Sequence, residues 1–118
     1  MSESGKETIY YLDHITAVPG KAKALLDFYM KSYVPKAEAR GMTLLHRLVA
    51  PPVWLENQSN DLFIIWTVQG PQAWWQATRM RRSDPELVGF WAAAETLIVS
   101  RRRSYLSDAM DVERLCNV

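Results

Sequence analysis

The chain has 118 residues, of which 48% are hydrophobic and 23% are charged, and its formal net charge is +1. This length allows one hydrophobic core but not two, so we expect a single domain. Because basic and acidic residues nearly balance, the chain has no general attraction to nucleic acid or to an anionic membrane, and neither is expected as a partner.

The sequence shows no signal for export or membrane insertion. Its first eight residues, MSESGKET, are polar and lack the apolar segment of a signal peptide. No run approaches the ~18 apolar residues that a membrane span requires. The single cysteine, Cys116, cannot form a disulfide within the chain, and so close to the end it is a poor candidate nucleophile. We therefore expect a cytoplasmic protein.

The first half of the chain predicts a strand, a helix and a second strand. Residues 8–17 alternate and are rich in Ile, Tyr and Thr, which favours a strand that Val-Pro-Gly ends. From Lys21 to about Arg40, apolar residues recur every three or four positions and predict a helix that stops at Gly41. Pro35 should kink or interrupt this helix, because it lacks a backbone donor. Residues 42–50 form the second predicted strand.

The second half predicts two more strands around a broken helix. Residues 61–68 are apolar on both faces, so this third strand should lie at the centre of the sheet. A helix should run from about Pro71 to Arg82 and restart at Ser-Asp-Pro-Glu-Leu, where Ser83 or Asp84 can cap it. Residues 97–106 form the fourth strand, and a short tail follows.

The predicted order is β-α-β-β-α-β, which is typical of an α+β, ferredoxin-like fold with a four-stranded antiparallel sheet and both helices on one face. We expect this domain to span residues 8–106, between a disordered N-terminal segment (1–7) and a C-terminal tail (107–118). Since the third strand is apolar on both sides, the second face of the sheet also needs a cover. Sheet-to-sheet packing of a second copy would supply it, so we expect a homodimer.

Several motifs in this order resemble the NIPSNAP-like branch of the dimeric α/β-barrel superfamily. They are the first strand IYYL followed by PGK, Arg40-Gly41 before the second strand, Trp66 in the third, and Asp84-Pro85-Glu86 in the second helix. The resemblance spans about residues 8–106. It implies a homodimer whose sheets face each other, with a small-molecule cleft between sheet and helices in each subunit. The superfamily includes monooxygenases, cyclases, isomerases, lyases and haem-degrading enzymes, so the fold does not select one reaction.

Strand alternation predicts which polar side chains face this cleft. We expect Tyr10 to pack against the helices, which places His14 on the cleft side and Asp13 toward the dimer interface or the strand edge. In the second strand His46 shares the parity of Leu44, so both histidines should face the cleft. The NIPSNAP-like pattern has small or neutral residues at these two positions. This departure makes His14 and His46 the candidate catalytic residues, because imidazole takes up and releases protons near neutral pH.

Aromatic and basic residues nearby are candidates for substrate binding. Tyr29 or Tyr33 could anchor a substrate through its hydroxyl, Trp66 and Trp75 could form flat walls for an aromatic ligand, and Arg79 could balance a carboxylate or enolate. Each has a structural alternative, since a strand histidine often makes only structural hydrogen bonds and a strand tryptophan often belongs to the core. Of the adjacent Trp74 and Trp75, at most one is expected to face the cleft.

Other signals argue against further chemistry. The sequence has no HExxH motif, paired cysteines or glycine-rich phosphate loop, so we expect neither a metal nor a cofactor. The run Arg101 to Arg103 suggests a nucleic-acid patch, but on a strand its side chains point in alternate directions and the stacking aromatics of an RNA-binding sheet are missing. We expect these arginines to be solvated, or to form ion pairs with Asp13 or with glutamates at the dimer interface.

These observations favour a small cofactor-independent enzyme of the isomerase, cyclase or lyase type, acting on a hydrophobic aromatic or polycyclic carbonyl metabolite through His14 and His46. Two alternatives stay open. One is a cofactor-independent monooxygenase of activated phenols, in which Trp66 and a base would suffice. The other is a non-catalytic dimer that binds a small molecule. Haem degradation is disfavoured because the second helix has no histidine to ligate iron.

Overall fold

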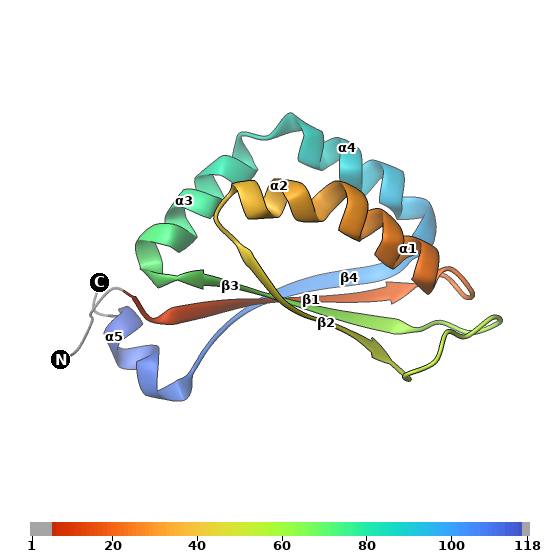
Figure 1. Cartoon of the computed structure of the whole chain (residues 1–118), viewed down its shortest axis with the longest axis horizontal. Helices are drawn as coiled ribbons and strands as arrows, with labels where there is room; N and C mark the ends of the chain where they lie inside the picture. Colours follow the sequence, from red (N-terminus) through yellow and green to blue (C-terminus); the bar gives the residue numbers. More distant parts are fainter. Residues whose placement is uncertain (1–5, 117–118) are drawn as a thin grey trace.

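Four antiparallel strands form one sheet, which is covered on one side by helices. The computed structural model describes residues 6–116. The strands are β1 (Thr8–Ala17), β2 (Thr43–Ala50), β3 (Asp61–Gln69) and β4 (Ile98–Ser107), in the spatial order β2-β3-β1-β4. Helices α1 to α4 all lie on the same side of this sheet (Figure 1). The ferredoxin-like order is confirmed, as is the central position of β3.

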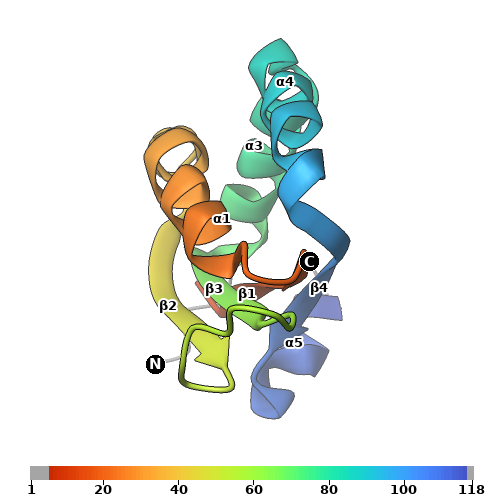
Figure 2. The same cartoon turned by 90° about the vertical axis from the view of Figure 1, so that its right-hand side faces the viewer.

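The helices form two rows above the sheet, one after β1 and one after β3 (Figure 2). The first row is α1 (Ala22–Phe28), the π-helix η1 (Tyr29–Tyr33) and α2 (Val34–Ala39). The second row is α3 (Gly70–Arg82), α4 (Pro85–Ala94) and the short 3-10 helix η2 (Glu95–Leu97). After β4 come η3 (Ala109–Asp111) and α5 (Val112–Cys116).

Both predicted interruptions of the helices are confirmed. Pro35 lies in the first turn of α2, directly after the π-helix. Because a proline ring crowds the carbonyl four residues earlier and donates no hydrogen bond, a locally widened helix accommodates it. In the second row, α4 restarts at Pro85, and the Asp84 carboxylate accepts a hydrogen bond from the Glu86 backbone N–H at 2.9 Å. Asp84 is therefore the N-cap, one of the two candidates named from the sequence.

The core lies between the helices and the helix-facing side of the sheet. On β3 this side consists of Leu62, Ile64, Trp66 and Val68, each no more than 2% exposed. On β1 it consists of Tyr11, Asp13 and Ile15, all buried. The side chains of Tyr29, Tyr33 and Phe90 close the layer from above.

The predicted orientation of β1 is wrong. Asp13, not Tyr10 or His14, belongs to the side that faces the helices, where it is 4% exposed and opposite Ile64. The reason is that both faces of this strand carry comparable apolar side chains, so alternation alone does not identify the buried one. The open face, opposite the helices, receives His14.

The predicted orientation of β2 is also wrong beyond its second residue. The pairing with β3 shifts between Leu44 and His46, so that Leu44 lies opposite Trp66 whereas His46 lies opposite Ile65. This irregularity leaves one extra residue, Leu45, and reverses the parity of the rest of the strand. His46 is thereby turned to the open face and is exposed.

The ends of the described chain lie beside each other near the start of β1 (Figure 1). Of the segment expected to be disordered, residues 1–5 lie outside the described residues, but Glu7 is buried and its carbonyl accepts a hydrogen bond from the Gly70 N–H at 2.8 Å. Residues 117–118 of the expected tail also lie outside. Within residues 6–116, no helix is long and apolar enough to cross a membrane.

Gly20 offers a test of how the turn after β1 is packed. It has φ of +76°, and a Cβ added there would clash with the Glu56 carbonyl oxygen. We expect Gly20→Ala to lower the free energy of unfolding by roughly 1–3 kcal/mol, because both the backbone conformation and the contact are unfavourable. Urea unfolding at equilibrium measures this.

Gly89→Ala is the matched control. Gly89 lies inside α4, and a Cβ there would meet no atom within 4 Å apart from the adjacent part of its own helix. Since alanine favours the helix over glycine, this variant should gain about 0.5–1 kcal/mol. Equal effects of the two substitutions would contradict the packing described for the turn.

Candidate functional site

A chain of buried hydrogen bonds runs through the middle of the core. The Trp66 indole Nε1 donates to the Tyr29 hydroxyl at 2.7 Å, and this hydroxyl donates to Asp13 Oδ2 at 2.9 Å. Arg103 holds the same carboxylate with two bonds, from Nε to Oδ1 at 2.6 Å and from Nη2 to Oδ2 at 2.8 Å. Such a bidentate pair fixes both side chains in one plane.

The chain continues from Arg103 to a second tyrosine and a second arginine. The Tyr33 hydroxyl accepts a hydrogen bond from Arg103 Nη2 at 2.8 Å and another from Arg40 Nη2 at 3.1 Å. We call the six residues of this chain the buried polar cluster: Asp13, Tyr29, Tyr33, Arg40, Trp66 and Arg103.

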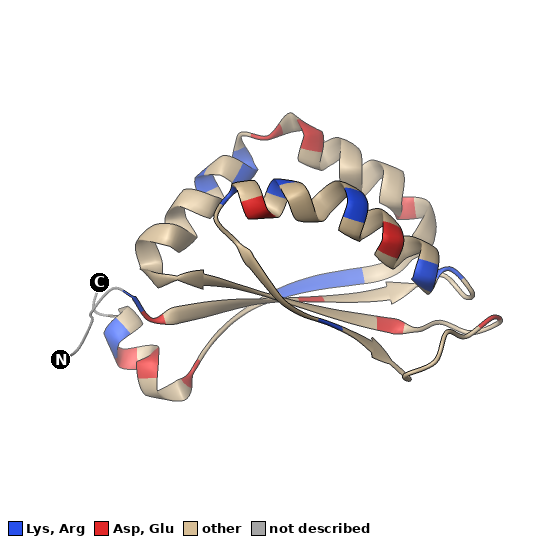
Figure 3. Cartoon of the chain, viewed as in Figure 1, with Lys and Arg blue, Asp and Glu red and all other residues tan. Residues whose placement is uncertain are grey.

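Local structure places each member of the cluster. Asp13 and Arg103 are paired across the β1–β4 ladder, so their side chains leave the sheet on the same side. Figure 3 shows a basic stretch in β4 where this strand runs along β1. The π-helix carries Tyr29 and Tyr33, whose rings stack at 4.7 Å between centroids. Their hydroxyls point toward the sheet, where they contact Asp13 and Arg103.

Burial and charge shift the protonation of this cluster. Burial, and next the negative charge of Asp13, raise the pKa of Tyr29 well above its usual value. Burial opposes the charge of Arg103, but the hydrogen bonds and charge of Asp13 outweigh it and raise the pKa of this guanidinium. Tyr29 therefore keeps its proton, and the cluster holds two guanidinium groups against one carboxylate.

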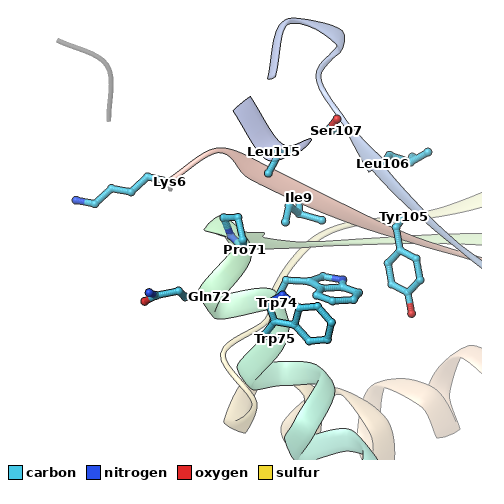
Figure 4. A pocket seen from close by; sticks show the side chains of 10 residues that line it. All are labelled: Lys6, Ile9, Pro71, Gln72, Trp74, Trp75, Tyr105, Leu106, Ser107 and Leu115. Atoms are coloured by element: carbon cyan, nitrogen blue, oxygen red, sulfur yellow. The ribbon is translucent and has the colours of Figure 1, made fainter. Parts of the chain in front are cut away.

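A large open cavity lies on the same side of the sheet, next to β1, β4 and the start of α3. Its volume is about 890 Å³, within the range of small-molecule sites. Figure 4 shows that the indoles of Trp74 and Trp75 lie beside each other on α3, with Tyr105 of β4 at one end. The other lining residues are Lys6, Ile9, Pro71, Gln72, Leu106, Ser107 and Leu115. Three aromatic rings thus form the walls, and a few polar groups lie among them.

Tyr11 separates this cavity from the buried polar cluster. Along β1 the side chains of Ile9, Tyr11 and Asp13 follow one another on the same face, from the cavity to the cluster. The Tyr11 ring meets Tyr105 edge-on at 5.2 Å between centroids, and the Arg103 guanidinium lies 5.3 Å from its centre. Burial raises the pKa of Tyr11 to about 12.

The structure divides the predicted substrate-binding residues into three groups. Tyr29, Tyr33 and Trp66 lie together in the buried polar cluster, and Trp66 is fully buried. Trp75 lies in the cavity of Figure 4, and so does Trp74 (ring centroids 4.6 Å apart), against the expectation that at most one would face a cleft. Both reach it because the cavity extends around the first turns of α3. Arg79, the remaining candidate, is exposed and does not line this cavity.

The two histidines lie on the open face of the sheet, away from the helices. His14 Nε2 lies 3.0 Å from Asp61 Oδ1, and its ring stacks on Phe63 at 4.5 Å between centroids. His46 is two strands and two residues away, which strand spacing makes roughly 12 Å between the Cα atoms. The structure therefore does not bring them together into the expected acid–base pair. The expectation that Asp13 and His14 do not bond to each other agrees with their separate partners.

Sequence reasoning did not identify Arg40 and Arg103 as site residues, and it placed Asp13 on the wrong face. One signal pointed to Arg103: an ion pair between Asp13 and the arginine run was expected at the dimer interface, and Arg103 makes this pair within the chain, on the buried face. The opposite directions expected for Arg101 and Arg102 also agree with their pairing opposite Ile15 and His14. Arg40 carried no such signal, because its partner Tyr33 comes from the preceding helix.

The fold is shared with solved NIPSNAP proteins. A NIPSNAP family protein of unknown function from Agrobacterium tumefaciens matches with a TM-score of 0.68 and 12% identity, over 88% of this chain and 90% of that one. An uncharacterized NIPSNAP-like domain protein from Burkholderia xenovorans gives 0.68 and 10%, over 87% and 86%. SnoaB, a cofactor-independent oxygenase from Streptomyces nogalater, gives 0.52 and 13%, over 86% and 93%.

At these identities the likeness establishes the fold and not an activity. No protein-family model matches the chain, and no curated protein matches its sequence. The resemblance read from the motifs is thus confirmed at the level of architecture.

The Asp13–Arg103 pair gives a sharp stability test. Asp13→Asn removes the only carboxylate of the cluster and leaves its guanidinium groups buried without a counter-charge, which should cost about 3–5 kcal/mol of unfolding free energy. Asp61→Asn is the control, since this carboxylate and its partner His14 are 40% and 41% exposed and should contribute less than about 1 kcal/mol. Chemical denaturation of both variants measures the difference, and similar losses would contradict a dominant buried pair.

Proposed function

We propose that this chain is a small cofactor-independent enzyme that binds a hydrophobic, planar aromatic metabolite in the cavity of Figure 4. The observation that carries the proposal is the aromatic wall formed by Trp74, Trp75 and Tyr105 around a volume of about 890 Å³. Flat rings pack well against indole faces, and such walls bury a polycyclic ligand without requiring many hydrogen bonds. Gln72 and Ser107 supply polar groups that can orient a carbonyl or hydroxyl on the ligand.

The position of the cavity beside the buried polar cluster supports catalysis over binding alone. Tyr105 and Tyr11 connect the ligand site to the Asp13–Arg103 pair through ring contacts. The cluster behind this aromatic wall holds two guanidinium groups against one carboxylate, and its net positive charge favours negative charge that develops on a bound ring. Stabilisation of an enolate or phenolate is the step shared by proton-transfer enzymes and by cofactor-independent oxygenases.

Oxygenation of an activated phenol is the second candidate, and the fold shared with a cofactor-independent oxygenase favours it. In that reaction the phenol loses its O–H proton and a ring carbon forms a bond to dioxygen. The peroxide takes up a proton, and loss of water with the proton of the same carbon leaves a quinone. The acid–base pair of His14 and His46 has no comparable support, because both lie on the other face of the sheet.

Replacement of one cavity tryptophan tests the ligand site. Trp75→Ala should weaken the binding of 9-fluorenone, a planar aromatic ketone, by about tenfold or more, since it removes one wall of the cavity. Tryptophan fluorescence quenching during titration measures the affinity. Oxygen uptake with a dihydroxynaphthalene, corrected for its spontaneous oxidation, then separates the oxygenase candidate from proton-transfer chemistry.

Trp54→Ala is the control for this experiment. Trp54 is 40% exposed and lies between β2 and β3, outside the residues that line the cavity. Its removal should leave the affinity for 9-fluorenone unchanged. If both variants bound the ketone as the native chain does, the proposed site would be wrong.

We further propose that the open face of the sheet packs against a second copy of the chain. Leu48 is 50% exposed there, next to the partly buried Phe63 and Ile65, and Figure 1 shows that α1 to α4 all lie on the other side. Apolar strands exposed on one face of a sheet are commonly buried by sheet-on-sheet packing.

The oligomeric state tests this packing. Leu48→Glu places a charge on the apolar part of the open face, on the edge strand β2, and should shift the chain from dimer to monomer in sedimentation velocity. Val88→Glu is the control, because Val88 is 74% exposed on α4, on the opposite side of the molecule. A native chain that sediments as a monomer at every concentration would refute the dimer.

A further inference from the structure

Arg40 is a buried cation whose hydrogen-bonding capacity is mostly unused. The residue is 4% exposed, and only Nη2 has a hydrogen-bond partner, the Tyr33 hydroxyl. Its Nε and Nη1 atoms are buried without any partner. Buried donors in folded proteins are nearly always paired, and unpaired ones on a charged group are particularly unfavourable. Two of the three nitrogens of the Arg40 guanidinium group thus donate no hydrogen bond in this structure.

The surroundings of Arg40 do not neutralise its charge. Asp13 is the carboxylate of the buried polar cluster, and Arg103 engages both of its oxygens. None of the ion pairs formed within residues 6–116 includes Arg40, whose guanidinium instead lies 5.4 Å from the centre of the Tyr33 ring. The Tyr33 hydroxyl therefore accepts hydrogen bonds from two cations, and the positive charge of Arg40 remains without an anion.

A groove between the two rows of helices leads to Tyr33. It has a volume of about 340 Å³, and its wall includes Phe28 and Phe90, whose rings stack at 5.0 Å between centroids. Lys36 and Glu86 form an ion pair across it, from α2 to α4. Their side chains are 43% and 66% exposed, so the pair is weak and can open.

We infer that Arg40 and Arg103 form a site for an anionic oxygen carried on an aromatic ring, a carboxylate or a phenolate, that enters through this groove. The ring of such a ligand would lie against Phe28 and Phe90, as flat apolar groups do in aromatic clefts. Its oxygen would take the free donors of Arg40 and compete with the Tyr33 hydroxyl for those already in use. Guanidinium groups are well suited to this task, because their planar fork matches a carboxylate. The site is separate from the cavity of Figure 4 and does not depend on the function proposed for it.

A direct readout exists in the unmodified chain. The side-chain Nε–H groups of buried arginines exchange slowly enough to be observed by NMR, and titration with benzoate should shift the Arg40 signal and that of Arg103. Benzamide, which has the same shape without the charge, should shift neither. A parallel titration with 4-nitrophenolate distinguishes a phenolate site from a carboxylate site. Unchanged Arg40 and Arg103 signals with both anions would overturn the inference.

Substitutions separate ligand binding from structure. Arg40→Met should fold with a melting temperature equal to or above that of the native chain, because it removes unpaired buried donors, and should bind the effective anion at least about tenfold more weakly. With the anion at about ten times its Kd for the native chain, the native melting temperature should rise by roughly 5 °C, and the variant should lose most of this rise. Arg79→Met, at an exposed arginine, should retain it.

A second variant keeps the test decisive if Arg40→Met does not fold. Tyr33→Phe removes the hydroxyl that accepts from both guanidinium groups. It frees these donors, so its affinity for the anion should rise several-fold, whereas a purely structural role of the arginines predicts no gain. Equal anion-induced melting shifts in the native, Arg40→Met and Tyr33→Phe chains would refute the site.

Discussion

The ion pair between Asp13 and Arg103 is the interaction on which the rest of the core depends. It joins neighbouring strands β1 and β4, and the same two side chains hold the hydroxyls of Tyr29 and Tyr33. Because charges removed from water must be paired closely, the pair fixes how the π-helix lies over the sheet. Trp66 then completes the arrangement by donating to Tyr29 from the other central strand. The Asp13 carboxylate thus links strands β1 and β4 through Arg103, and links them to the first row of helices through the two tyrosines.

This arrangement also separates the chemistry of the molecule into distinct places. The cavity with Trp75 lies on one side of the buried polar cluster, and the groove with Phe90 leads to its other side at Tyr33. Tyr11 stands between the cavity and the charged pair, so charge acts on a ligand there through a ring and not by direct contact. The open face, with His14, belongs to neither site.

The helices and strands could be predicted because each depends on residues close together in sequence. The side of the sheet to which the side chains of a strand point could not be predicted in this way. Periodicity and the positions of Pro35 and Asp84 sufficed for the helices, as the π-helix and the cap confirm. Which side of β1 turns toward the helices depends on which side buries a charged residue. Burial of Asp13 requires its partner Arg103, which is 90 residues away in the sequence. On β2 the irregularity at Leu45 reverses the parity without any glycine or proline to signal it. Both histidines were misplaced for these reasons.

A cluster selected for stability alone would not contain Arg40. Replacement of buried ionic groups by apolar residues of similar size often leaves stability unchanged or improves it. The Asp13–Arg103 pair can be explained structurally, since its donors and acceptors are matched. Arg40 cannot, because two of its three nitrogens face the interior unpaired and the one bond it makes duplicates a contact that Arg103 already makes to Tyr33. Such an unsatisfied charge is the kind of local cost that proteins retain at binding sites, and a ligand anion is the group that would remove it.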